Sequence, residues 1–116
     1  MNTEQKAVCL KYKLAFLATS EDVVVGVADN VFLGLQPING LRHNPEKGTS
    51  GWFVWAGETY SEEPDFFKPM HAGHILETYP EIYKYLGLAP GGRFLIDTDK
   101  GYVDVWFDKK LVSEKS

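Results

Sequence analysis

The sequence predicts a single α+β domain over residues 1–116, with a mostly antiparallel sheet of about four or five strands. Three observations support this class. Helical patterns occur at the N-terminus and in the middle of the chain, β-branched or aromatic runs lie between them, and two strand-like segments joined by a turn come near the C-terminus. Of the 116 residues, 44% are hydrophobic and 24% are charged, so the chain can bury one core and does not have the composition of a disordered protein.

The first predicted element is an N-terminal helix over residues 3–13. Ala7, Leu10 and Leu14 have the i, i+3, i+7 spacing of one helical stripe, so we expect these three side chains to face the core. Residues 14–18 are apolar and fit either a continuation of this helix or a short strand.

Two β-strands are predicted next. Residues 23–27 (VVVGV) are β-branched, and Gly26 within them indicates a bulge or a close approach of the backbone to a neighbour. Residues 52–56 (WFVWA) are apolar at every position, so we expect this strand at the centre of the sheet, with both of its faces covered. Alternation places Trp52, Val54 and Ala56 on one face, and Phe53 and Trp55 on the other.

Loops are predicted on both sides of this aromatic strand. Residues 36–50 hold several turn-forming residues and are expected to form a long loop or a pair of turns, which makes them a candidate contact surface or ligand pocket. Residues 58–65 form an acidic loop.

The second half of the chain predicts a helical pair followed by a β-hairpin. Residues 71–86 have a helical pattern interrupted by Pro80, which suits the first turn of a second helix because its missing N–H has no partner there in any case. Residues 93–96 and 102–107 are the expected hairpin strands. We expect Val103, Val105 and Phe107 to face the core, which leaves Tyr102, Asp104 and Trp106 on the opposite side. Residues 113–116 are expected to be a frayed tail.

Charge and cysteine content narrow the functional class. The formal net charge is −4 and no basic cluster is present, so a nucleic-acid partner is not expected. Cys9 is the only cysteine, which rules out an intrachain disulfide and is typical of a reducing compartment. The N-terminus lacks the pattern of a secretory signal, and the apolar runs are too short to span a bilayer. We therefore expect a cytoplasmic protein without membrane association.

The sequence contains no convincing catalytic or metal-binding motif. His71 and His74 have a spacing that can place two imidazoles on one metal ion, but no third or fourth ligand occurs at a motif spacing. Asp97, Asp99 and Gly101 resemble part of a calcium loop, yet they fit a hairpin turn better. We therefore expect a non-enzymatic binding protein with no catalytic residues, no metal site and no cofactor.

A partner-binding surface is the remaining functional prediction. Tryptophan and tyrosine are common in binding hot spots, and acidic residues steer basic partners. The acidic loop and the outer side of the predicted hairpin supply such residues, and the 36–50 segment adds Arg42 and His43. The candidate partner-binding residues are Arg42, His43, Glu58, Glu62, Glu63, Asp65, Tyr102, Asp104 and Trp106.

Several separated blocks of the chain resemble the immunity protein 33 family of bacterial proteins, and the resemblance spans residues 5–112. The blocks are residues 37–43 (PINGLRH), 51–55 (GWFVW), 61–67 (SEEPDFF), 80–86 (PEIYKYL), 90–96 (PGGRFLI) and 104–108 (DVWFD). The chain departs from the family pattern at Gly92, where a bulkier residue is expected before Arg93.

The resemblance implies a small cytoplasmic protein that neutralises a cognate polymorphic toxin, and it brings no catalytic residues. If the toxin is a basic nuclease, the acidic 58–65 loop is suited to its phosphate-binding cleft. We expect a monomer or a weak homodimer. The alternative is a small-molecule-binding domain or an enzyme with a pocket near Arg42, His43 and His71.

Overall fold

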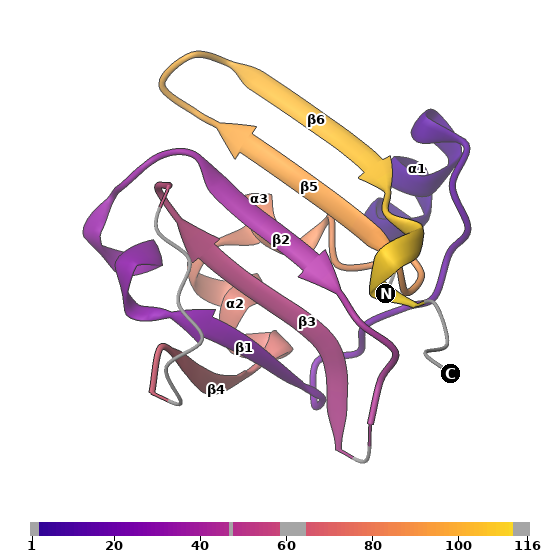
Figure 1. Ribbon diagram of the computed structural model, residues 1–116, viewed down its shortest axis with the longest axis horizontal. Helices are drawn as coiled ribbons and strands as arrows, with labels where there is room; N and C mark the ends of the chain where they lie inside the picture. The colour runs from indigo at the N-terminus through magenta and orange to yellow at the C-terminus, as the bar shows by residue number, and fades with distance from the viewer. Residues whose placement is uncertain (1–2, 47, 59–64, 113–116) are drawn as a thin grey trace.

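A six-stranded mixed sheet with three α-helices on one of its faces forms the framework of the protein (Figure 1). The computed structural model describes residues 3–46, 48–58 and 65–112. The strands are β1 (Val24–Ala28), β2 (Ile38–Arg42), β3 (Thr49–Ala56), β4 (Phe67–His71), β5 (Gly92–Asp97) and β6 (Tyr102–Phe107). The helices are α1 (Thr3–Tyr12), α2 (Ala72–Thr78) and α3 (Pro80–Tyr83), with 3-10 turns η1 (Asp29–Leu33) and η2 (Lys109–Leu111).

The strand order is β4-β1-β3-β2-β5-β6, in which β1 and β3 are parallel and the other neighbours are antiparallel. The predicted α+β class and mostly antiparallel sheet are therefore confirmed, whereas the predicted number of strands was too low. None of the helices in the described ranges has the length and hydrophobicity needed to cross a bilayer.

Strand β2 lies inside the segment that was predicted to be a long loop. Asn39 and Gly40, which indicated a turn, occupy the middle of this strand, between β3 and β5. Gly40 is required because the Phe94 ring lies where its Cβ would be, at 2.2 Å. The Asn39 side chain points to the other face and donates to the carbonyls of Pro37 and Gly57. Long-range packing therefore overrides the local turn preference.

Strand β4 was also not predicted. Pro69 in its middle removes a backbone donor, which is compatible with a strand only at the edge of a sheet. β4 is such an edge, because within the described ranges it pairs only with β1.

The predictions for β1 and β3 are confirmed. The register between these strands shifts beside Gly26, and a Cβ at this position would lie 2.8 Å from the Phe53 ring. β3 is third in the strand order, and its apolar side chains enter both hydrophobic clusters of the domain. Trp52, Val54 and Ala56 pack on the helix side, and Trp55 packs on the other side.

Helix α1 is confirmed, and Leu14 packs against the core as predicted, but Ala7 and Leu10 of the predicted stripe are exposed. Leu10 is 79% exposed, whereas Gln5, Val8 and Cys9 are buried. Gln5 can be buried because its side-chain amide donates to the carbonyls of Thr19 and Tyr83 and accepts from the Thr19 N–H. The segment after α1 forms an isolated bridge between Phe16 and Leu88.

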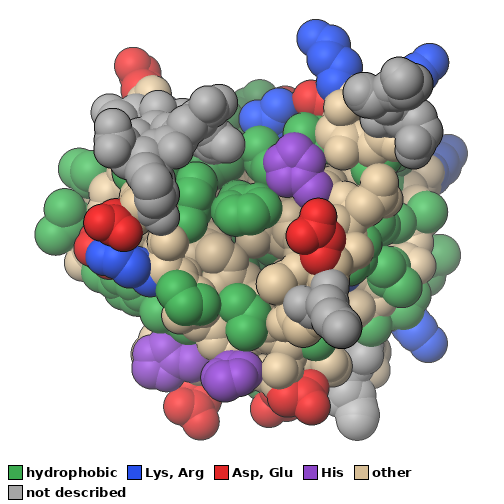
Figure 2. Space-filling view, turned by 60° about the horizontal axis from the view of Figure 1, so that its bottom comes forward, with side chains coloured by type: hydrophobic (Ala, Val, Ile, Leu, Met, Phe, Trp, Pro, Cys, Tyr) green, Lys and Arg blue, Asp and Glu red, His purple; other side chains and the backbone are tan. Residues whose placement is uncertain are grey.

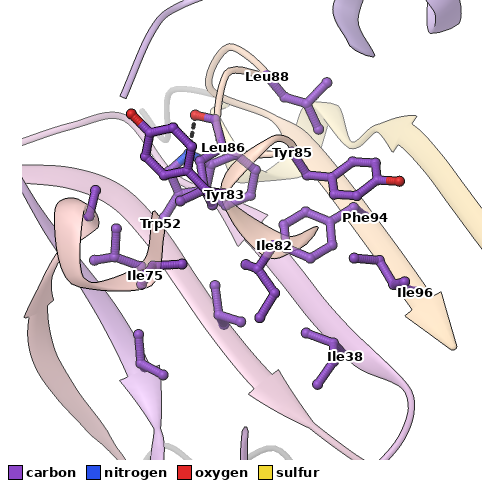
Figure 3. Packing of buried hydrophobic residues seen from close by; sticks show 14 of the residues in the cluster. Ile38, Trp52, Ile75, Ile82, Tyr83, Tyr85, Leu86, Leu88, Phe94 and Ile96 are labelled. Carbon is purple, nitrogen blue, oxygen red and sulfur yellow. Dashed lines mark hydrogen bonds between the residues drawn. The ribbon is translucent and has the colours of Figure 1, made fainter. Parts of the chain in front are cut away.

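The main core lies between the helices and the sheet, as Figure 3 shows. The helical pair split at Pro80 is confirmed, and Ile75, Ile82 and Tyr83 of this pair are buried against the strands. The Trp52 indole N–H donates to the Leu86 carbonyl at 2.9 Å, which ties the chain that follows α3 to the central strand.

The C-terminal hairpin is confirmed as β5 and β6, with its turn closed by a bond from the Lys100 N–H to the Asp97 side chain. The expectation for its core-facing residues was only partly correct. Val105 is buried, but Val103 and Phe107 are 38% and 52% exposed because β6 is the other edge of the sheet. The predicted frayed tail lies outside the described residues.

Candidate functional site

The sheet face opposite the three α-helices is the candidate binding surface, and we call it the open face. It is the face turned toward the viewer in Figure 1. Strand pairing and alternation determine which side chains it carries. From one edge to the other they include Phe67, Pro69, His71, Ala28, Phe53, Trp55, Asn39, Leu41, Arg93, Leu95, Tyr102, Asp104 and Trp106.

Four aromatic rings gather on the open face near β4, and we call them the aromatic cluster. Phe67 is central, with ring centroids 4.8 Å from Phe66, 5.1 Å from Phe53 and 6.3 Å from Trp55. Trp55 is buried, while the three phenylalanines are partly exposed. Figure 2 shows hydrophobic side chains at the surface in this part of the molecule, with few charges among them.

His43 extends the aromatic cluster toward the C-terminal turn. Its ring meets Phe53 edge-on at 5.8 Å, and its Nδ1 lies 3.4 Å from the Leu111 carbonyl. The predicted partner-binding residues include His43 but not Phe53, Phe66 or Phe67. Alternation had placed Phe53 and Trp55 on one face, but it could not show that the three α-helices of the described residues all pack on the other face.

Tyr102, Asp104 and Trp106 form a second group on the open face, which we call the hairpin strip. They lie on one side of β6, as the predicted alternation required, and Tyr102 is 51% exposed. The Trp106 ring packs on the Arg93 guanidinium at 5.3 Å. Arg93 in turn donates to Asp108 at 3.0 Å, and this bond lowers the pKa of the Asp108 carboxyl.

Acidic residues collect at one end of the sheet. The register brings the ends of β1 and β3, the start of β4 and the β5–β6 turn to the same end. Two of the predicted acids, Glu58 and Asp65, are exposed there, whereas Glu62 and Glu63 lie outside the described residues. The acids near this end are Asp29, Glu58, Asp65, Asp97 and Asp99, against the bases Lys68 and Lys100.

Arg42 is a structural residue in the interior and does not belong to the open face. It is 2% exposed and stacks over Trp52 on the helix side of the sheet. Its Nη1 donates to the Leu17 and Leu88 carbonyls at 2.7 and 2.8 Å, and its Nε donates to Ser50 at 2.8 Å. Burial lowers the pKa of Arg42 to about 10, so the guanidinium stays charged at neutral pH.

The structure does not bring Arg42, His43 and His71 together into one pocket. Arg42 faces the helices, and His43 contacts the open face. His71 ends β4, three strand spacings from β2, which is about 14 Å. A groove of about 290 Å³ lies elsewhere, and it is lined by Glu4, Ala7, Val8, Lys11, Tyr12, Lys84 and Tyr85.

The described part of the chain holds neither a metal site of three ligands nor an exposed thiol. No group of three or more His, Cys, Asp or Glu side chains is placed to hold a metal ion in residues 3–46, 48–58 and 65–112. Cys9 is buried, its thiol donates to the Gly87 carbonyl, and burial raises its pKa, which disfavours the nucleophilic thiolate.

Comparison with known protein families identifies the family of this chain. The family model of the Imm33-like domain matches residues 4–108. The chain belongs to the Imm33-like domain family. No curated protein sequence and no solved structure matches this chain. The resemblance noted in the sequence is thereby confirmed, and membership of the family indicates an immunity-protein role.

The family resemblance of this Imm33-like domain rests largely on its scaffold. Residues 37–43, 51–55 and 90–96 include β2, the middle of β3 and most of β5, which are neighbouring strands at the centre of the sheet. The departure at Gly92 has a local reason, because a Cβ there would lie 2.5 Å from the Leu88 Cβ. A bulkier residue at this position would require the preceding turn to move.

Proposed function

We propose that this Imm33-like domain neutralises a cognate bacterial toxin in the cytoplasm by direct contact, without catalysis and without a cofactor. The observation that carries the proposal is the family match, which covers almost the whole domain. The surroundings of Cys9 and the helix-side position of Arg42 support binding over chemistry, because neither group is accessible as a reactive centre.

The open face is the proposed contact surface. The aromatic cluster and the hairpin strip supply Phe, Tyr and Trp side chains, which bury large areas at low cost in conformational entropy. The acidic end of the sheet lies beside both groups and would steer a basic toxin toward them. A basic nuclease is one toxin class that fits this arrangement.

The binding test uses the toxin encoded next to this gene, purified as an inactive variant. We expect a stable complex with the wild-type protein. Tyr102→Ala should raise Kd roughly tenfold, because a half-exposed tyrosine at an interface contributes on the order of 1–2 kcal/mol. Leu10→Ala, which truncates an exposed side chain on α1, is the matched control and should leave Kd unchanged.

Electrostatic steering is tested on the same complex. E58K/D65K should lower the association rate at low salt by roughly tenfold, and the difference should shrink as salt is added. E4K/E77K makes the same change in charge at exposed positions on α1 and α2 and should have a small effect on this rate. The absence of any complex at micromolar concentrations would contradict the proposed function.

A further inference from the structure

The two edges of the sheet differ in their protection against pairing with another strand. On β4, the Ala72 N–H donates to the Val23 carbonyl, so alternation along the strand directs the backbone groups of Phe67, Pro69 and His71 away from β1. Pro69 thus removes an outward N–H from the middle of this edge. The exposed Lys68 adds a charge, and both features are common protections of natural edge strands.

Strand β6 has no proline, and its only charged residue is Asp104. The Asp108 N–H donates to the Gly91 carbonyl at 2.7 Å, and this bond sets the alternation along the β5–β6 ladder. The backbone N–H and C=O groups of Val103, Val105 and Phe107 therefore point outward. Among the described residues no segment pairs with this edge, and Figure 1 shows β6 as the outermost strand.

The side chains along this edge are mainly apolar. Val103 and Phe107 are 38% and 52% exposed on the helix side, and Tyr102 is exposed on the open face. Asp104 is the only charged residue within the strand. An extended edge with these features is suited to adding a further strand, because a strand satisfies the outward backbone groups and covers the apolar side chains.

We propose that β6 pairs antiparallel with β6 of a second copy of this chain, forming a continuous twelve-stranded sheet around a two-fold axis at Val105. Twelve is twice the six strands of one copy. In this register Val105 faces Val105 of the second copy, and Val103 faces Phe107 of the second copy. All three are outward-directed positions, so each pair can exchange backbone hydrogen bonds.

A second copy fits this edge because the sequence of β6 is self-complementary about Val105. The register sets apolar Val103 against apolar Phe107, and it sets Asp104 against Trp106 instead of another carboxylate. A two-fold axis at Asp104 instead of Val105 would place Asp104 opposite Asp104 of the second copy, where like charges repel. The dimer does not depend on the proposed toxin binding, because it needs only β6 and its backbone.

The test is sedimentation equilibrium of the purified full chain from about 10 µM to about 1 mM. A pair of six-residue strands buries less area than a standard interface, so we expect a reversible dimer with Kd on the order of 100 µM. V103K/F107K places like charges opposite each other twice and should raise Kd roughly tenfold. V103K/F107E places opposite charges there and should return Kd to within roughly threefold of the wild type.

L33K is the matched control, because Leu33 is an exposed apolar residue in η1, away from β6, and this variant should dimerise like the wild type. Circular dichroism of each variant checks that the fold is kept. A wild-type chain that stays monomeric at 1 mM would overturn the proposal. So would a dimer that V103K/F107K leaves intact, or one that V103K/F107E does not restore.

Discussion

At the scale of single residues, two buried polar side chains link segments that are distant in the sequence. Gln5 bonds to the backbone of Thr19 and Tyr83, and Arg42 bonds to the carbonyls of Leu17 and Leu88. Polar residues of this kind are normally exposed, and the sequence prediction placed Arg42 on a contact surface within the 36–50 segment. Their burial is stable only because each polar atom finds a partner.

Removing the Arg42 side chain should therefore destabilise the domain strongly. R42A leaves the carbonyls that it contacts without their donors, which should lower the free energy of unfolding by about 3 kcal/mol or more in urea titrations. R42K keeps a charge but loses the planar fork, so it should recover only part of this stability.

R93A is the control for this prediction. Arg93 forms a partly exposed ion pair with Asp108, so its loss should cost about 1 kcal/mol or less. The hydrogen bonds of Arg42 indicate that it links the sheet to the 86–88 segment. If R42A were no more destabilising than R93A, this role would be contradicted.

At the scale of elements, strands with regular apolar patterns were predictable and irregular ones were not. β1, β3, β5 and β6 are rich in β-branched or aromatic residues, so local pattern was sufficient. β2 was missed because Gly40 is selected by the Phe94 ring across the strand pair, and β4 was missed because Pro69 suits only an edge. The reason for each of these residues is its position in the sheet relative to strands that are distant in the sequence.

The end of the β5–β6 hairpin provides a prediction for acid pH. Asp108 accepts hydrogen bonds from the Arg93 side chain and from the Lys110 N–H, and these bonds lower its pKa below the ordinary value of 3.8. The folded state thus binds this proton less readily than the unfolded state does. The resulting stability is complete above pH 3.8 and is lost as the pH falls through the lowered pKa.

D108N removes this contribution. The difference in unfolding free energy between the wild type and D108N should be largest near neutral pH and should shrink below pH 3.8 in urea titrations. D104N is a suitable control, since Asp104 is exposed on the same hairpin. A difference between wild type and D108N that is constant with pH would contradict this role of Asp108.

At the scale of the whole molecule, the sheet has one face under helices, one open face and two edges of different character. Strand β3 lies at the centre of the sheet and is paired on both sides, with β1 and β2. Strand β6 is the less protected edge. The aromatic cluster lies on the open face near β3 and β4, and the hairpin strip lies on the same face at β6. A stable scaffold therefore positions the proposed contact surface.

Hydrogen exchange should follow this layout. We expect amides in the middle of β3, such as those of Val54 and Trp55, to exchange only through global unfolding, because neighbours pair with both sides of the strand. The outward amides of Val103, Val105 and Phe107 should exchange orders of magnitude faster in dilute, monomeric protein. Nuclear magnetic resonance resolves both sets, and equal protection of the two would contradict the assigned strand order.

The sequence by itself determined the α+β class, the central aromatic strand, the C-terminal hairpin and the family. These features follow from periodicity and local propensity, which act over a few neighbouring residues. Only the tertiary structure decided that residues 38–42 are a strand, that Arg42 is interior and that, within the described residues, all three α-helices lie on one sheet face. Those outcomes depend on hydrogen bonds and ring contacts between residues distant in the chain, such as Arg42 with Leu88 and Gly40 with Phe94, and no local pattern records them.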